Sequence, residues 1–110
     1  MSTENLKNNR REYSRYQLDK TELADEPAEQ FKLWLSEAEN DKLPDYNAMV
    51  LSTSDSEMQP HSRIVLLRDI VPEGLVFYTN YQSNKGLEIA DNKRVSLLFF
   101  WPSHERQVRI

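Results

Sequence analysis

The spacing of apolar side chains predicts one amphipathic helix in the first half of the chain. Four apolar residues recur at intervals of three and four positions: Phe31, Trp34, Leu35 and Ala38. This period places them on one helical face. Pro27 suits the first helical turn, and Pro44 cannot continue the hydrogen-bond ladder. We therefore expect a helix over residues 27–41, with Glu37, Glu39 and Asp41 on its solvated side.

The stretch before this helix lacks a sustained period. Residues 1–24 are polar and charged, and at most a short helix around residues 6–13 fits the pattern. We expect residues 1–24 to form a mobile N-terminal arm and residues 25–110 to form the folded domain.

After Tyr46 the pattern changes to alternating or continuously apolar runs. Five runs are candidate strands: residues 48–53, 63–68, 75–79, 95–101 and 106–110. Five strands favour a barrel or a sandwich, and the fold class is therefore mainly β with helices, an α+β domain. The connections over 54–60 and 69–74 are short and rich in turn residues, which favours an antiparallel meander of the first three strands.

One short helix is expected between the third and fourth strands, over residues 84–91. Ser83 can cap it and Asn92 can close it. Leu87 and Ala90 can face the core. The last strand alternates as far as its final apolar residue without a closing turn, and we expect a truncated chain whose sheet lacks part of its pairing.

Composition excludes several classes of site. The chain of 110 residues suits one domain, and its two glycines, Gly74 and Gly86, cannot supply a dinucleotide fingerprint or a Walker A loop. With no cysteine it has no disulfide, thiolate metal site or cysteine nucleophile, which suits a reducing cytoplasm. No apolar run approaches the ~20 residues of a spanning helix, so we expect no membrane partner.

Charge locates the anion-binding capacity in the second half. The formal net charge is -4; residues 1–60 carry 7 basic and 13 acidic side chains, and residues 61–110 carry 7 and 5. An acidic chain with dispersed cations is a poor nucleic-acid binder, and a small anionic ligand fits better.

Two stretches offer anion sites. At the start of the second helix, Ser83, Asn84 and Lys85 could bring backbone N–H groups and an ammonium to a phosphate, although the same residues also suit plain helix capping. Arg63 and Arg68 bracket an apolar strand, and alternation places them on opposite faces. They could serve two anions, or they could be solvated strand ends.

Other features carry weaker signals. The arm segment from Arg10 to Tyr13 could fold over a phosphate, residues 77–80 place an aromatic ring and a hydroxyl near a strand end, and Gln107 lies on the opposite face from its neighbours. His61 and His104 have no acidic or histidine partner at metal-ligand spacing, so we expect exposed imidazoles. No nucleophile triad is evident, so in an enzyme a cofactor would carry the chemistry.

Taken together, these motifs resemble the N-terminal half of the pyridoxamine 5′-phosphate oxidase family. The resemblance spans nearly the whole chain: residues 10–13, 31–35, 63–68, 76–80, Ser83 with Lys85, 94–99 and 105–108. It implies a split-barrel fold, a cytoplasmic homodimer with flavin mononucleotide (FMN) near the subunit interface, and oxidation of pyridoxamine or pyridoxine 5′-phosphate to pyridoxal 5′-phosphate. Hydride would pass from the substrate to the flavin, and O2 would reoxidise it to give hydrogen peroxide.

The resemblance also assigns site residues. It implies FMN contacts for Arg63, Ile64, Val65, Leu66, Leu67, Arg68, Tyr78, Thr79, Lys85 and Gln107. It implies substrate contacts for Arg10, Arg11, Glu12, Tyr13 and Arg68. No catalytic residue and no metal is assigned. The family usually has lysine at the position of Arg68 and arginine at that of Asn84, so one cation at the FMN phosphate is lost here and weaker cofactor binding is expected unless backbone donors compensate.

Later substrate-binding motifs of the family lie beyond Ile110, so we expect poor turnover by these 110 residues alone. Two other functions stay open. One is a different split-barrel flavoprotein, such as a flavin reductase-like protein, and the other is a non-catalytic dimeric module that binds FMN or another phosphate ligand.

Overall fold

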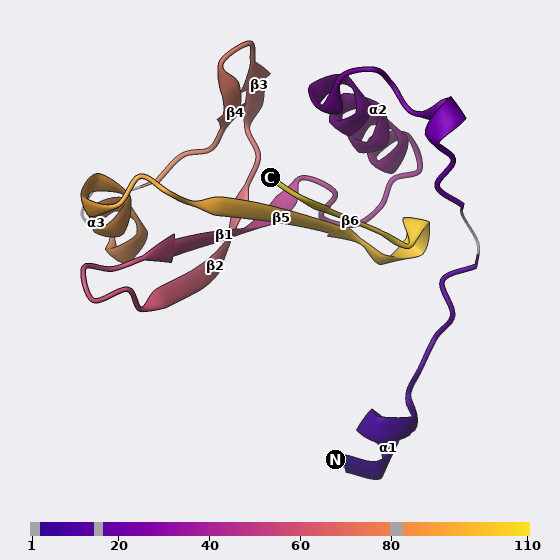
Figure 1. Cartoon of the computed structure of the whole chain (residues 1–110), viewed down its shortest axis with the longest axis horizontal. Coiled ribbons are helices and arrows are strands. Elements are labelled where there is room, and N and C mark those ends of the chain that lie inside the picture. Colours follow the sequence, from indigo (N-terminus) through magenta and orange to yellow (C-terminus); the bar gives the residue numbers. More distant parts are fainter. Residues whose placement is uncertain (1–2, 15–16, 80–82) are drawn as a thin grey trace.

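The centre of the molecule is an antiparallel sheet of four strands in the order β2-β1-β5-β6 (Figure 1). The computed structural model describes residues 3–14, 17–79 and 83–110. The strands are β1 (Ala48–Ser54), β2 (Pro60–Leu66), β5 (Ser96–Trp101) and β6 (Arg106–Arg109). All their pairings are antiparallel. The α+β class expected from the sequence is therefore present.

Alternation along the strands separates the two faces of this sheet. The buried face carries the core side chains Met49, Leu51, Val65, Leu97, Phe99 and Trp101. The opposite face leaves Ile64, Leu66 and Phe100 exposed. Because successive strand residues point to opposite faces, one face of the sheet packs in the core and the other exposes apolar side chains to solvent.

Helix α2 (Pro27–Asn40) covers the buried face, as the apolar spacing predicts. Pro27 occupies the first turn, and Asp41 ends the helix. Phe31 and Ala38 are buried against the sheet, and the indole Nε1 of Trp101 donates a hydrogen bond to the Tyr46 carbonyl oxygen at 2.8 Å. The Phe31 ring packs against the rings of Phe99 and Trp101, so an aromatic cluster joins the helix to the sheet.

The expected meander is wrong in its third strand. The chain leaves the main sheet after Leu66, and β3 (Asp69–Val71) pairs with β4 (Gly74–Val76) in a separate two-stranded sheet. Gly74 has φ 149, a conformation that favours glycine and allows the tight turn between the two strands. The strand expected over 75–79 is therefore shorter, since β4 ends at Val76. Its partner β3 lies in residues 69–74, which were expected to form a connection.

Helix α3 (Asn84–Asp91) has the predicted bounds. The hydroxyl of Ser83 accepts a hydrogen bond from the Gly86 amide at 3.3 Å, and Asn92 ends the helix. The expected core face is wrong, because Leu87 is 58% exposed and Ala90 is exposed, whereas Glu88 is buried at 7%. The carboxylate is buried because it finds hydrogen-bond donors on β1 and β2.

The N-terminal segment contains two short helical turns. Helix α1 (Thr3–Asn8) lies earlier than the expected helix around residues 6–13, and η1 (Lys20–Glu22) is capped by Asp19, which accepts from the Thr21 amide at 2.9 Å. Figure 1 shows α1 projecting away from the sheet. Within the described residues, no helix has the length and apolar character needed to cross a membrane.

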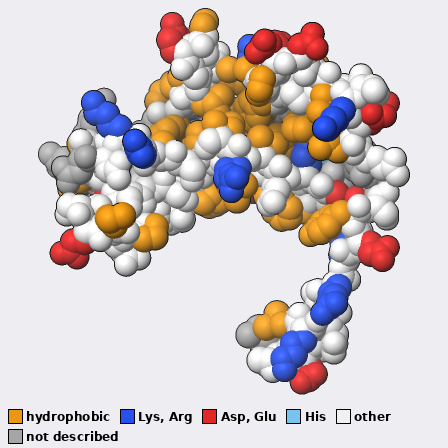
Figure 2. Space-filling model, in the orientation of Figure 1, with side chains coloured by type: hydrophobic (Ala, Val, Ile, Leu, Met, Phe, Trp, Pro, Cys, Tyr) orange, Lys and Arg blue, Asp and Glu red, His pale blue; other side chains and the backbone are white. Residues whose placement is uncertain are grey.

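An apolar groove lies between α2, the β3–β4 hairpin and β6. Its volume is about 600 Å³, and its walls include the apolar side chains of Phe31, Ile70, Leu75, Val108 and Ile110. Figure 2 shows hydrophobic side chains gathered in this part of the molecule. The groove and the open sheet face together leave much apolar surface uncovered in a single chain.

Candidate functional site

The best-defined polar cluster in the described chain surrounds the Arg63 guanidinium on β2. Its Nη1 donates to the Thr53 hydroxyl at 2.7 Å and to the Leu51 carbonyl oxygen at 3.2 Å. Its Nη2 lies 3.5 Å from a carboxylate oxygen of Glu88 on α3. The Arg63 side chain is 22% exposed, so the guanidinium is held in place yet reachable from solvent.

Glu88 on α3 connects this guanidinium to side chains of two strands, β1 and β2. Its carboxylate accepts hydrogen bonds from the Thr53 hydroxyl and forms an ion pair with His61, in addition to the contact with Arg63. The Thr53 hydrogen bond is the main cause that lowers the pKa of Glu88; burial opposes it, and His61 and Arg63 lower the pKa further. Glu88 is therefore a carboxylate at neutral pH.

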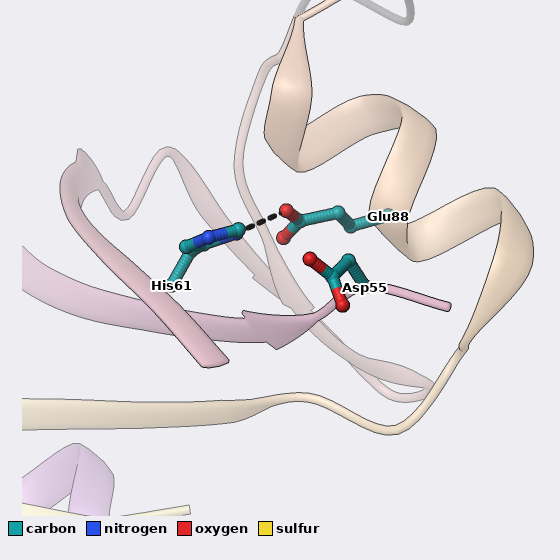
Figure 3. A group of neighbouring side chains, drawn as sticks. All are labelled: Asp55, His61 and Glu88. Carbon is teal, nitrogen blue, oxygen red and sulfur yellow. Dashed lines mark hydrogen bonds and ion pairs between the residues drawn. The ribbon is translucent and has the colours of Figure 1, made fainter. Parts of the chain in front are cut away.

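Asp55, His61 and Glu88 converge at the β1–β2 turn (Figure 3). Their ligand atoms lie within 4.8 Å of one another. One Asp55 oxygen accepts the backbone N–H groups of Glu57 and Gln59, both at 2.9 Å. Two carboxylates and an imidazole can ligate a divalent cation, but both Glu88 oxygens already have protein partners, one of them the positive Arg63.

The N-terminus of α3 adjoins this cluster. Lys85 is half-buried in the first turn, and Asn84 is exposed. Lys85 and Glu88 are three residues apart, so they lie on the same side of the helix. Lys85 and the positive end of the helix dipole thus lie about one turn before Glu88, the carboxylate that contacts Arg63, and this part of the molecule is suited to an anion.

The segment that leads from β4 toward α3 contributes an unsatisfied hydroxyl. The Oγ1 atom of Thr79 is buried and has no hydrogen-bond partner among the described residues. The neighbouring Tyr78 is 75% exposed. Asn80, the last residue of this motif, lies outside the described residues. Buried polar atoms are rarely left unpaired in proteins, so Thr79 fits a position where a ligand or water supplies the missing partner.

The predicted stretch over 63–68 is divided between core and solvent. Val65 and Leu67 are buried, whereas Ile64 and Leu66 point outward. Arg68 is exposed just beyond β2, where it lines a hollow of about 330 Å³ with Glu39 and Tyr46. The two arginines thus occupy different environments, as alternation predicts.

Two groups of predicted site residues lie apart from Arg63 and Lys85. Gln107 is exposed on β6, which is separated from β2 by β1 and β5. In the arm, the Arg11 guanidinium donates to the Pro102 carbonyl oxygen at 2.7 Å, lies 3.5 Å from Glu105 and stacks over the Tyr13 ring at 5.3 Å. Pro102 begins η2 (Pro102–His104) and Glu105 directly follows it, and Figure 1 places the arm and α3 at opposite ends of the molecule.

Sequence reasoning missed Thr53, Asp55 and Glu88, because no local motif links a strand, the turn that follows it and a distant helix. Of the two histidines expected to be exposed, only His61 is exposed. The exposure of His61 was predicted correctly, but its ion pair with Glu88 was not. His104 is buried at 4%, and its Nε2 lies 2.7 Å from Asp41 at the end of α2. A helix end that packs on the β5–β6 turn supplied a partner that sequence spacing could not reveal.

The family model and the curated relatives that match this chain carry the same family name. Residues 35–110 match the family model described as "Pyridoxamine 5'-phosphate oxidase". Curated relatives named pyridoxine/pyridoxamine 5′-phosphate oxidase include one from Cupriavidus necator, 50% identical over 101 residues, and one from Thermosynechococcus vestitus, 46% identical over 101 residues. Each alignment covers 92% of this chain and 48% of the relative. The chain therefore spans about half the length of the curated relatives it matches.

Solved structures agree on the fold. PhzG from Burkholderia lata 383, in complex with tetrahydrophenazine-1-carboxylic acid, has a TM-score of 0.78 at 28% identity, covering 82% of this chain and 45% of that one. A pyridoxamine 5′-phosphate oxidase-related, FMN-binding protein from Nostoc punctiforme has a TM-score of 0.67 at 21% identity, covering 81% and 46%. These likenesses confirm the predicted split-barrel fold class.

Proposed function

The chain belongs to the pyridoxamine 5′-phosphate oxidase family, and from that premise we propose that the protein binds FMN and oxidises pyridoxamine or pyridoxine 5′-phosphate to pyridoxal 5′-phosphate with O2 as acceptor. The observation that carries the proposal is the contact of Arg63 with Glu88 of α3, one helical turn after Lys85 in the first turn of the same helix. A helix N-terminus with two cations is a site for a phosphate group.

The donor set fits FMN. Arg63 and Lys85 offer charge to its phosphate, the first-turn amides of α3 offer backbone N–H groups, and the orphaned Thr79 hydroxyl offers one more hydrogen bond. None of these contacts needs a glycine-rich loop, which this chain lacks. When bound, FMN would supply the hydride acceptor and the means of passing electrons to O2.

The other predicted site residues lie in three different places, and we propose a different role for each group. Ile64, Leu66, Tyr78 and Gln107 present exposed side chains that FMN or a partner could cover. Arg68 is an exposed cation away from the Arg63 cluster, which suits the phosphate of the substrate. We propose that residues 1–24 form an arm and residues 25–110 form the folded domain. Arg10–Tyr13 belong to this arm, which would close over a substrate bound to the domain.

A homodimer is part of the proposal. The outer sheet face exposes Ile64 at 64% and Phe100 at 57%, and a second copy would cover this apolar surface. A dimer also explains why the arm and Gln107 lie far from Lys85 in one chain, since residues from two copies can meet at one interface. We place the protein in the cytoplasm, because a chain without cysteine depends on no disulfide.

The decisive test is binding of FMN to the purified chain, measured by quenching of flavin fluorescence. We expect FMN to bind more tightly than riboflavin, which has no phosphate. Charge reversal at Arg63 or Lys85 should abolish that preference, whereas Lys93→Glu, which changes an exposed lysine just beyond the other end of α3, should preserve it. A folded sample that ignores FMN, or reversals that leave binding intact, would overturn the proposal.

A different substrate is the main alternative, because PhzG shares the fold and its structure holds a tetrahydrophenazine carboxylic acid. Anaerobic mixing of the FMN-loaded protein with pyridoxine 5′-phosphate separates the possibilities, since only a suitable substrate bleaches the flavin absorbance. Deleting residues 1–14 should weaken the response to pyridoxine 5′-phosphate if the arm contacts that substrate. A flavin that stays oxidised would favour another substrate or a non-catalytic module.

A further inference from the structure

We propose that Glu88 is a positioning residue for the cofactor phosphate: through Thr53 it fixes the Arg63 guanidinium beside α3, about one helical turn from Lys85. This inference rests on the proposed FMN site and adds a residue that the family resemblance does not assign. Glu88 is buried and would act through Arg63, not by contact with FMN.

The Thr53 hydroxyl lies between Glu88 and Arg63 and bonds to both. This group has one hydrogen to donate, and it donates that hydrogen to Glu88. Its lone pairs are then left for the Arg63 Nη1 group, which lies 2.7 Å away. Glu88 therefore sets the direction of the Thr53 hydroxyl, and the hydroxyl in turn sets the position of the guanidinium.

Partners among the described residues use only part of the hydrogen-bonding capacity of Arg63. A guanidinium has five N–H groups. Among the described residues, both Nη1 hydrogens are directed to Leu51 and Thr53, and one Nη2 hydrogen to Glu88. The Nε–H group and the other Nη2–H group remain, and in a guanidinium these two can form a fork for a bidentate phosphate contact. The buried contacts thus hold one edge and leave another for an anion.

Glu88 also attaches α3 to the sheet. The helix carries Lys85 and the first-turn amides at one end, and Glu88 joins it to β1 through Thr53 and to β2 through His61 and Arg63. One buried carboxylate therefore sets both the guanidinium and the helix end that face the same phosphate.

The sign of the effect distinguishes positioning from simple electrostatics. A carboxylate near a phosphate repels it, so Glu88 acting only as a charge would weaken FMN binding, and Glu88→Gln would strengthen it. Positioning predicts the opposite, because the neutral amide is a weaker acceptor for both Thr53 and Arg63. The two explanations cannot both account for one measured change.

The experiment is a double-mutant cycle on FMN binding by the full chain. The variants are Glu88→Gln, Arg63→Gln, the double variant, and Glu73→Gln, a control that removes an exposed carboxylate at the β3–β4 turn. We expect Glu88→Gln to raise the Kd for FMN about tenfold, to leave the Kd for riboflavin nearly unchanged, and to have little further effect once Arg63 is glutamine. Glu73→Gln should match the unsubstituted chain.

Other results for FMN binding would overturn the positioning role of Glu88. Tighter or unchanged FMN binding by Glu88→Gln, or the same loss with and without Arg63, overturns the positioning role while FMN binding by the unsubstituted chain still upholds the proposed function. No FMN binding by the folded, unsubstituted chain overturns both. If Glu88→Gln does not fold, Thr53→Val decides, since it removes the hydroxyl and should weaken FMN but not riboflavin binding. A Kd for FMN that depends on added EDTA would assign Glu88 to a metal and also overturn the inference.

Discussion

Phe31 of α2 packs against Phe99 of β5, with ring centroids 5.0 Å apart and planes tilted by 55°. Phe99 is completely buried, and the Trp101 ring lies 5.6 Å from it. This contact joins the helix, which precedes every strand in sequence, to one of the two central strands of the sheet. The aromatic cluster therefore attaches α2 to the sheet.

Phe31→Ala should destabilise the protein by about 3 kcal/mol, because it removes a buried ring and leaves a cavity. Urea unfolding followed by tryptophan fluorescence measures this change. Leu33→Ala is the matched control, since Leu33 is on the same helix but 53% exposed, and it should cost no more than about 0.5 kcal/mol. Equal losses for the two variants would show that α2 is not held by its buried face.

Asn84→Arg should strengthen FMN binding by several-fold, because it adds a cation in the first turn of α3 beside Lys85. Asn40→Arg makes the same chemical change at the end of α2 and should leave the Kd for FMN unchanged. The gain should shrink as salt is added, since exposed charges are screened. An equal gain in both variants would point to net charge and not to a phosphate at α3.

Ser83→Ala should destabilise α3 by about 1 kcal/mol, because the hydroxyl no longer accepts the Gly86 amide hydrogen bond. FMN binding should weaken in parallel if the first turn of α3 contributes its amides. Ser83→Asp restores a capping acceptor but adds a negative charge, so it should recover stability without recovering FMN affinity. Full recovery of both would contradict a phosphate at this helix end.

The stability contributed by Glu88 should depend on pH. Its pKa is lowered in the folded protein, chiefly by the Thr53 hydrogen bond, so the unfolded chain binds the proton more tightly. The contribution is fully present above the ordinary glutamate pKa of ~4.3 and is lost as the pH falls through the lowered folded value. Asp19, whose pKa is lowered by Thr21, adds to the same trend.

Chemical unfolding at several pH values tests this. The difference in unfolding free energy between the unsubstituted chain and Glu88→Gln should be largest near neutral pH and should shrink on acidification. Glu73→Gln, which removes an exposed carboxylate, should differ little at any pH. A Glu88→Gln difference that stays constant down to low pH would contradict the ionised, hydrogen-bonded state of this carboxylate.

Local patterns were enough to predict both longer helices. Pro27 and the apolar spacing define α2, and Ser83 and Asn92 define α3. The alternation of β6 was also predicted, with Gln107 exposed between two half-buried neighbours. These features depend on residues a few positions apart, whose interactions are set by helix and strand geometry.

The hairpin of β3 and β4 was not predicted, because a strand of three residues carries little periodic signal. Ser83 and Lys85 were singled out correctly as the start of a helix, but their neighbour Glu88 was not, and Leu87 was placed in the core instead. A helical face is chosen by what packs against it, and here the opposing surface offers Thr53, His61 and Arg63.

The sequence by itself determined the family resemblance, the α+β class and the cations that suit a phosphate, since these follow from composition, spacing and motif order. Only the tertiary structure decided which groups hold those cations. The contacts of Arg63 with Thr53 and Glu88, and of His104 with Asp41, join segments far apart in the chain. Such pairings arise from packing among strands and helices, and no local spacing encodes them.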